Sequence, residues 1–295
     1  MKKLLLTGAS GFLGWNLCQY PQSSWEIIGC YHQQPEGVPI HIQKEKIDLG
    51  DFQAIGKMVD RIQPDAIVHL AAISNTQYCH EHPELSEQLN VYTPGQIAEV
   101  CARHSIPFVF ASSGQVYSGN QAPYTETDEL QPLNAYGQQK VKAEQLVASL
   151  NSSACIFRPT VMFGQHSDSS YCFMTDWLAR WQRGEEVTAF HDEIRCFLSG
   201  RSASEGILLL LEKEASGIFN LAGKDTLSRL TFAKLMVKVF SVKDAKIKSA
   251  SQQDIPGLAE VRPSDLTMNL NKIKSLGFEA AGVETELKKL LMNRK

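Results

Sequence analysis

Short apolar runs alternate with amphipathic stretches along the first half of the chain. Apolar runs occupy residues 3–8, 25–31, 65–72, 107–113 and 154–159, with a weaker one at 41–48, and helical periodicity lies between them at 12–20, 52–62, 84–104 and 134–150. Strands separated by helices in this way are typical of parallel βαβ units. The runs "AIVHLAA" and "FVFAS" are apolar nearly throughout, as expected for strands that helices cover on both faces. The pattern therefore predicts an α/β protein with a doubly wound parallel sheet.

The regular alternation stops after Pro159. The segment "FGQHSDSSYCFM" is polar and rich in turn residues; helical patterns follow at 169–183 and 203–214, then a strand at 217–223, a helix at 228–240 and a basic helix near the C-terminal end. No repeat, low-complexity tract or proline-rich linker marks a boundary. We predict a sheet domain over residues 1–160 and a smaller α/β region over 161–295. A return of the chain to the sheet within the second region stays open.

Composition and charge argue against several kinds of partner. The chain has 295 residues, is 43% hydrophobic, and carries a net charge of -3 from 29 Lys and Arg and 32 Asp and Glu, so it offers no basic field for nucleic acid or an acidic membrane. Seven cysteines without a C-x-x-C pair and eight histidines without a ligand spacing predict neither a disulfide framework nor a metal site. The N-terminal apolar run is only three leucines long. We therefore expect a cytoplasmic protein without a signal peptide or a membrane span.

A glycine-rich turn follows the first predicted strand. In "TGASGFLG" the glycines are Gly8, Gly11 and Gly14, and the next residues have the pattern of a helix. Glycines in this position let the backbone turn tightly and approach a pyrophosphate, which the positive N-terminus of the helix then binds. The sequence thus predicts a dinucleotide site at the start of the chain.

The end of the second strand bears on the choice between NAD and NADP. An acidic residue there would hydrogen-bond the ribose 2′-hydroxyl and repel a 2′-phosphate, but this chain has Tyr31, His32 and Gln33. We therefore expect NADP, with NAD left open. Further on, Asp48 and Leu49 follow the weak strand, where a carboxylate could contact the adenine; the alternative for this stretch is a helix N-cap, for which Asp51 is the better candidate.

Three candidate catalytic residues follow the fifth strand. Ser113 lies at its carboxyl end, where open α/β sheets bind their ligands, with Ser112 beside it. Tyr136 and Lys140 are spaced i, i+4 in "NAYGQQKVKAEQLV", which on a helix puts both on one face, about 5–6 Å apart at Cβ. An ammonium close to the phenol would favour the phenolate and shift its pKa towards neutral, so we predict that Tyr136 acts as a general acid while the serine hydroxyl polarises a carbonyl.

With these motifs in place, the chain resembles the extended short-chain dehydrogenases/reductases over nearly its whole length. The markers are "TGASGFLG", "DL" at 48–49, "HLAA", "SSGQVY", "YGQQK" and "RPTVMFG", in the order and at the spacing of that family. The resemblance implies a Rossmann-type sheet domain with a smaller substrate-binding region, and it is greatest to the dTDP-4-dehydrorhamnose reductase branch. Such enzymes reduce the C4 ketone of a nucleotide-linked 6-deoxysugar with NAD(P)H.

The resemblance also implies residue roles. Ser113, Tyr136 and Lys140 correspond to the catalytic set, with Lys140 also holding the nicotinamide ribose, and Asn90 matches an asparagine that supports the lysine through water. Ser113, Gln115, Arg195 and Arg262 are expected at the substrate, where a guanidinium can bind a phosphate through two hydrogen bonds. For Arg195 and Arg262 the alternative is a surface or interdomain ion pair. The expected cofactor-binding residues are Gly8, Ser10, Gly11, Phe12, Leu13, Gly14, Tyr31, His32, Asp48, Leu49, Leu70, Ala71, Ala72, Asn90, Tyr136, Lys140 and Arg158.

Two departures from the branch bear on the substrate. Gly114 and Gln115 stand where an Asp-Tyr pair is usual, and Ser202 stands where an acid often follows the arginine of "RCFLSGRSASEG". The hypothesis favoured here is a nucleotide-sugar ketone reductase that binds neither nucleic acid nor membrane; whether it forms a homodimer stays open. The alternatives are a non-catalytic NADP-binding regulator, since the branch includes the β subunit of methionine adenosyltransferase, and an epimerase that retains its NAD.

Overall fold

The fold is organised around one seven-stranded parallel sheet. The structure, a computed structural model, describes residues 1–21 and 24–292. The strand order is β11-β6-β5-β4-β1-β2-β3, and every pair is parallel. The strands are β1 (Lys2–Thr7), β2 (Trp25–Tyr31), β3 (Gln43–Lys46), β4 (Ala66–His69), β5 (Phe108–Ala111), β6 (Cys155–Pro159) and β11 (Gly217–Leu221). This confirms the predicted α/β class and the doubly wound sheet.

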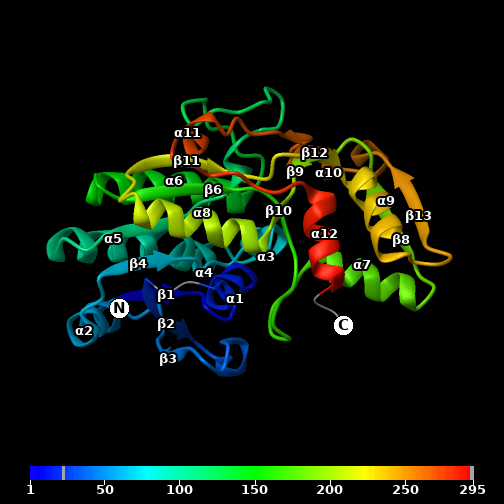
Figure 1. Cartoon of the computed structure of the whole chain (residues 1–295). Coiled ribbons are helices and arrows are strands. Elements are labelled where there is room, and N and C mark those ends of the chain that lie inside the picture. Colours follow the sequence, from blue (N-terminus) through cyan, green and yellow to red (C-terminus); the bar gives the residue numbers. More distant parts are fainter. Residues whose placement is uncertain (22–23, 293–295) are drawn as a thin grey trace.

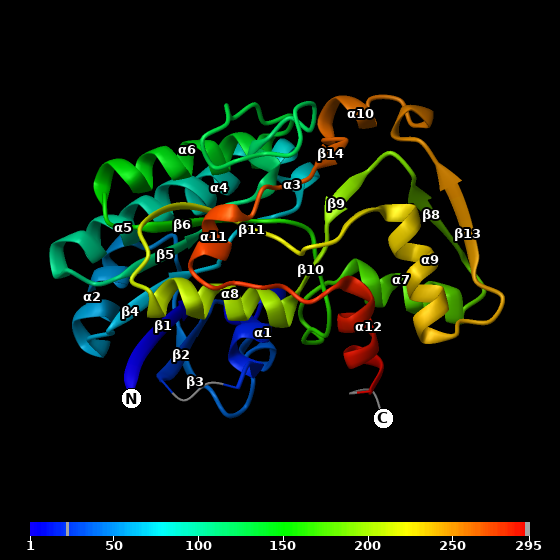
Figure 2. The ribbon, with the colours of Figure 1, turned by 45° about the horizontal axis from the view of Figure 1, so that its top comes forward.

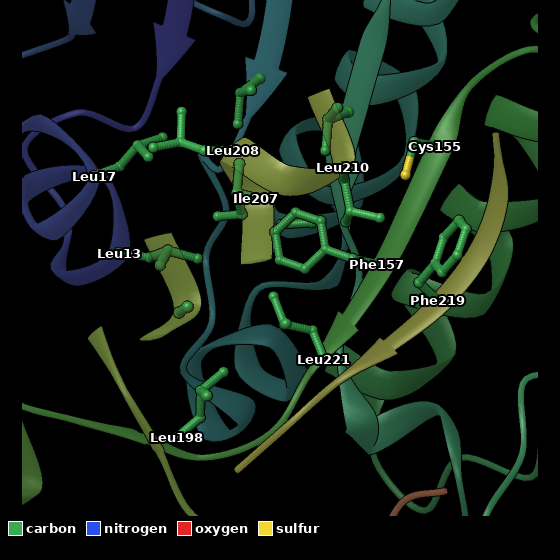
Figure 3. Packing of buried hydrophobic residues seen from close by; sticks show 14 of the residues in the cluster. Leu13, Leu17, Cys155, Phe157, Leu198, Ile207, Leu208, Leu210, Phe219 and Leu221 are labelled. Carbon is green, nitrogen blue, oxygen red and sulfur yellow. The ribbon is translucent and has the colours of Figure 1, made fainter. Parts of the chain in front are cut away.

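Helices cover both faces of this sheet (Figure 1). One face packs against α1 (Phe12–Gln19) and α8 (Gly200–Glu212), and the other against α2 (Phe52–Ile62), α5 (Thr93–His104) and α6 (Ala135–Leu150). Side chains of a strand point alternately to the two faces, so in β1 Leu4 and Leu6 enter the first core while Leu5 enters the second. Figure 3 shows the first core, to which α1 contributes Leu13 and Leu17, α8 contributes Ile207, and β6 contributes Phe157. Burial of each such side chain contributes about 1.5–3 kcal/mol to folding.

A smaller region with its own core lies beside the sheet domain (Figure 2). Its main helices are α7 (Phe173–Gln182), α9 (Arg229–Phe240) and α12 (Val283–Met292). Parallel strands β8 (Glu186–Phe190) and β13 (Lys246–Ala250) form one edge, while β9 (Ile194–Cys196) pairs with β12 (Thr226–Ser228) and β14 (Asp265–Leu266). The short strands β7 (Met162–Phe163) and β10 (Leu198–Ser199) pair near the junction with the sheet domain.

The chain returns to the main sheet after leaving it at residue 160. Helix α8 packs on α1, and β11 pairs with β6 at the sheet edge. The predicted boundary at residue 160 therefore separates two stretches of sequence, but the sheet takes six strands from the first stretch and β11 from the second.

Several local details differ from the sequence pattern. The segment predicted as one helix at 84–104 contains α4 (Pro83–Glu87), a π-helical turn (Gln88–Tyr92) and α5, with α3 (Thr76–Glu81) just before them. The remaining short helices are α10 (Leu258–Val261) and α11 (Asn271–Ser275), with 3₁₀ turns at Pro35–Gly37, Gly114–Val116 and Gln252–Asp254. Across residues 1–21 and 24–292, no helix is both long enough and apolar enough to span a membrane. The seven cysteines all lie in this part of the chain, buried and free, and no cluster of three potential metal ligands was found there.

Candidate functional site

Ser113 directly follows β5 and begins the 3₁₀ turn at Gly114–Val116. Its backbone is extended, and its Oγ accepts a hydrogen bond from the Gln115 amide at 3.1 Å. The neighbouring Ser112 has a different environment, because its hydroxyl donates to the buried carboxylate of Glu144. Of the two serines, Ser113 is the one that acts on Tyr136, whose pKa it lowers.

Helix α6 carries both Tyr136 and Lys140 and places them near the end of β5. The Lys140 Nζ lies 5.7 Å from the centre of the Tyr136 ring and 4.7 Å from that of Phe110, and it donates to the Ala111 carbonyl at 2.8 Å. Helix α6 packs closely on the turn after Ser113, because a Cβ at Gly137 would lie only 2.3 Å from the Gln115 carbonyl oxygen. The structure thus brings Ser113, Tyr136 and Lys140 together at the carboxyl end of β5.

Burial controls the electrostatics of this cluster. It raises the pKa of Tyr136, and the polar Ser113 side chain offsets only part of the rise. It lowers the pKa of Lys140 to about 7, against the opposing effect of Glu144. The expectation that the lysine would bring the pKa of the phenol towards neutral is therefore wrong for this structure, since burial has the largest effect on that pKa and raises it. Tyr136 stays protonated near neutral pH, as a proton donor must.

The glycine turn adjoins the end of β4. Gly8 has a φ of +72°, which favours glycine, and a Cβ there would lie 2.7 Å from the Ala71 amide nitrogen. A Cβ on Gly14 would lie 2.1 Å from the Gly8 carbonyl oxygen. Gly11 precedes α1, whose first turn has neither a side-chain cap nor an acid. The N–H groups of this turn are thus not capped by side chains, which suits an anion.

A short polar segment lies against the glycine turn. The Ser167 hydroxyl donates to the Ser10 carbonyl at 3.3 Å, and a Cβ on Gly37 would lie 2.1 Å from the Ser169 Oγ. The serine-rich stretch of the predicted turn region therefore contacts both the glycine turn and the loop after β2.

Polar side chains lie near the carboxyl ends of β2 and β3. His32 Nε2 lies 3.9 Å from an Asp48 carboxylate oxygen, and both side chains are exposed. Asp48 accepts a hydrogen bond from Gly50, while Asp51 caps α2 by accepting from Gln53 and Ala54, so the N-cap alternative holds for Asp51. Lys46 pairs with Tyr31 in the register of β3 on β2. Sequence reasoning missed this lysine because the pattern of β3 was weak.

Two residues expected at the cofactor have other partners in the structure. Asn90, in the π-helical turn, accepts from the Ile73 amide at 2.9 Å and donates to the Ile73 carbonyl at 2.9 Å and to Gln139 at 2.8 Å. Arg158 lies in the interior, paired with Glu144 and bonded to the Tyr117 hydroxyl and the Glu126 carbonyl. The structure therefore favours structural roles for both side chains.

The expected substrate residues divide into two groups. Arg195 is buried and donates to the carbonyls of Ile194, Pro263 and Ser264, which leaves it little capacity for a ligand. Arg262 is 40% exposed, and its Nη1 lies 3.3 Å from Glu193. A cavity of about 190 Å³ lies beside it, lined by Tyr171, Phe173, Trp177, Thr188, Phe190, Glu193, Arg229 and Arg262.

Arg229 is the notable residue of this cavity that sequence reasoning missed. Its guanidinium lies 4.2 Å from the centre of the Phe173 ring, and its Nε lies 3.1 Å from the same Glu193 carboxylate that pairs with Arg262. Its Nη1 is buried without a hydrogen-bond partner among the described residues. Only the fold brings Arg229 and Arg262 to one carboxylate, so no sequence signal could have paired them.

The departure at Gly114 has a steric explanation. A Cβ at this position would lie 2.3 Å from the Met268 methyl carbon and 3.4 Å from the Pro159 carbonyl oxygen. The adjacent Gln115 accepts a hydrogen bond from the Asn134 side chain at 2.7 Å. Met268 thus fills the space beside Ser113 that a larger residue at 114 would need.

Comparison with known proteins gives matches over the whole chain. A family model described as RmlD substrate binding domain matches residues 1–295. Methionine adenosyltransferase 2 subunit beta of Rattus norvegicus is 25% identical over 284 residues, 94% of this chain and 83% of the relative. A protein of Haloferax volcanii named "probable low-salt glycan biosynthesis reductase" is 26% identical over 289 residues, 96% of this chain and 95% of the relative.

Solved structures share the fold at low sequence identity. The dTDP-4-dehydrorhamnose reductase of Bacillus anthracis in complex with NADP has a TM-score of 0.87 and 19% identity, covering 100% of both chains. The UDP-glucose 4-epimerase of Thermus thermophilus in complex with NAD has a TM-score of 0.80 and 19% identity, covering 98% of both chains.

Proposed function

The chain belongs to the RmlD substrate binding domain family, and from this premise we propose that it is an NAD(P)H-dependent reductase of a nucleotide-sugar ketone. The observation that carries the proposal is the convergence of Ser113, Tyr136 and Lys140 beside the carboxyl end of β5. A regulator would not need a buried, protonated phenol between a hydroxyl and an amine.

The residues of the chain supply the proton and the polarisation. The Ser113 hydroxyl donates a hydrogen bond to the substrate carbonyl, and Tyr136 delivers its proton to the same oxygen as negative charge develops there. Lys140 favours the phenolate that this transfer leaves behind. The reduced nicotinamide, when bound, supplies the hydride to the carbonyl carbon.

The cofactor would lie along the carboxyl edge of the sheet, from the glycine turn to the catalytic cluster. The pyrophosphate fits the N-terminus of α1, where the first turn has no acid and no side-chain cap. We favour NADP over NAD because His32 and Lys46 flank the end of β2 and no carboxylate follows that strand directly. The complex of the Bacillus anthracis reductase with NADP supports this choice, and the complex of the Thermus thermophilus epimerase with NAD keeps the other open.

The cavity beside Arg262 is the proposed binding site for the diphosphate group of the substrate. Two guanidinium groups, Arg229 and Arg262, meet there across one carboxylate, and Phe173, Trp177 and Phe190 offer apolar walls. Guanidinium groups bind phosphates and aromatic rings pack against bases, so the lining matches both parts of such a ligand.

A regulatory role is the second candidate. It is favoured by the β subunits of methionine adenosyltransferase, which match 94% of this chain. On this reading the protein binds the dinucleotide and turns nothing over. An epimerase, the third candidate, would purify with bound NAD.

The test has two parts. A calorimetric titration measures binding of NADPH and of NADH, and a spectrophotometer then follows the reduced cofactor when a dTDP-4-keto-6-deoxysugar is added. We expect absorbance of the reduced cofactor to fall only after the ketone is added, and faster with NADPH. Tight binding of NADPH without turnover of this ketone or its UDP counterpart would favour the regulator. Bound NAD in the purified protein, with interconversion of two sugar epimers, would favour the epimerase.

A further inference from the structure

Asn134 holds three segments together at the start of the catalytic helix. Its Oδ1 accepts from the Gly137 amide at 2.9 Å and so caps α6. Its Nδ2 donates to the Gln115 side chain at 2.7 Å and to the Val261 carbonyl at 3.0 Å. The cap itself needs only the oxygen, since serine or aspartate would serve equally well there. The two bonds from the nitrogen are therefore an additional feature of the asparagine.

The segment that Asn134 reaches is otherwise held by few contacts. Helix α10 has no buried residue, and most side chains from Gln253 to Val261 are exposed. Its far end is fixed by Asp192, whose carboxylate accepts from the Ser251 hydroxyl and the Gln252 amide. Figure 2 shows α10 between the two regions of the molecule, next to β14. The Asn134 side chain thus anchors the end of α10 to the start of α6.

The anchored carbonyl lies one residue from a cavity arginine. Val261 precedes Arg262, whose guanidinium reaches Glu193 and lies 5.7 Å from the centre of the Phe190 ring. On the other side, Tyr136 follows Asn134 by two residues. A single side chain therefore connects the backbone that carries Arg262 with the helix that carries the proton donor.

We propose that Asn134 is a positioning residue that couples binding of the substrate diphosphate at Arg262 to the placement of the ketone against Tyr136. The inference rests on the proposed nucleotide-sugar substrate and deepens it. The bond to Val261 limits how far the α10 segment can move, so an anion held by Arg262 stays in register with α6. Gln115 accepts the second hydrogen bond from the Asn134 Nδ2, which connects the turn after Ser113 to α6 and the α10 segment.

The test separates the cap from the coupling. In Asn134→Ser the hydroxyl retains the cap but cannot reach both Gln115 and Val261, and Asn134→Asp retains the cap in the same shape without the donor. Dissociation constants for dTDP, UDP and NADPH are measured by calorimetry for the wild type, N134S, N134D, R262A and N134S/R262A, after a thermal melt confirms folding. The ketone assay gives KM and kcat for the same set.

We expect N134S and N134D to weaken binding of the nucleoside diphosphate by about 5- to 10-fold, the size of one lost hydrogen bond, with NADPH affinity unchanged. KM for the ketone should rise by more than kcat falls. In the R262A background the same change should have less than about a twofold effect, because coupled residues are not additive. The inference would be overturned if N134S weakened nucleoside diphosphate binding by the same factor with and without R262A. It would also be overturned if nucleotide affinity were unchanged in both N134S and N134D.

Failure of the proposed function gives a different result. If the wild type binds dTDP or UDP but reduces no ketone, the reductase proposal fails while the binding cycle still tests Asn134. A wild-type chain that binds neither nucleotide overturns the inference itself.

Discussion

Arg158 and Glu144 form a two-pronged ion pair in the interior, with Nε and Nη2 of the arginine 2.9 and 2.6 Å from the two carboxylate oxygens. Both side chains are almost fully buried. The pair joins β6 to α6, and the hydroxyl of Ser112 adds β5 to the same network. Helix α6 is therefore fixed to the neighbouring strands by charge as well as by apolar packing.

Removal of one partner from this pair should destabilise the fold. We expect Arg158→Ala to lower the free energy of unfolding by about 3–5 kcal/mol, because it leaves the Glu144 carboxylate buried and unpaired. Urea denaturation measures the change. The control is Arg103→Ala, whose exposed pair with Glu99 within α5 should contribute no more than about 0.5 kcal/mol. If R158A were as stable as R103A but bound NADPH weakly, the original cofactor role of Arg158 would be correct instead.

Replacement of Tyr136 tests the proton donor. Tyr136→Phe removes the hydroxyl and leaves the buried ring in place, so we expect turnover of the ketone to fall by roughly 10²–10⁴ with NADPH affinity nearly unchanged. The exposed Tyr92→Phe serves as the control and should behave as the wild type. Unchanged turnover in Y136F would contradict the proposed role of Tyr136 as the proton donor.

The sequence predicted those parts of the fold that depend on local periodicity. Tyr136 and Lys140 share a face because four residues make about one helical turn, and Ser113 lies at a strand end because the apolar run stops there. Both statements need only neighbours along the chain. The same holds for the glycine turn after β1.

The sequence could not place residues whose partners are distant. Arg195 was expected at a phosphate, but the fold brings the carbonyls of Pro263 and Ser264 to its guanidinium. The edge pair β8 and β13 was missed for the same reason. These two strands pair with each other although α8, β11 and α9 lie between them in the chain. Non-local pairing leaves no periodic signal in either segment.

Lys140 should make stability depend on pH. Burial lowers its pKa to about 7 from 10.5, so between these values the unfolded chain holds a proton that the folded chain has released. The free energy of unfolding should then rise with pH through this window, because the unfolded state binds more protons. Below about 7 both states are protonated, and this contribution to the slope disappears.

Lys140→Met isolates this effect. The variant lacks the titrating amine but keeps every other ionisable group. We therefore expect the unfolding free energy of K140M minus that of the wild type to decrease steadily as pH rises above about 7. Urea denaturation at a series of pH values gives this difference. A constant difference across the series would mean that the lysine keeps its ordinary pKa in the folded protein.

The glycine turn offers a pair of substitutions with opposite expected signs. Gly8→Ala forces a Cβ to within 2.7 Å of the Ala71 amide nitrogen at a φ of +72°. The left-handed backbone alone costs roughly 1–2 kcal/mol, and the contact must in addition displace the end of β4. We expect both lower stability and loss of NADPH binding, because the turn that would approach the pyrophosphate changes shape.

Gly56→Ala is the matched control. Gly56 lies within α2, where a Cβ meets no atom within 4 Å, so this change should stabilise the protein by about 0.5–1 kcal/mol. Thermal melts and calorimetry with NADPH measure both variants. Normal NADPH affinity in G8A would mean that the dinucleotide binds elsewhere, since no ordinary side chain fits between this turn and β4 without moving them apart.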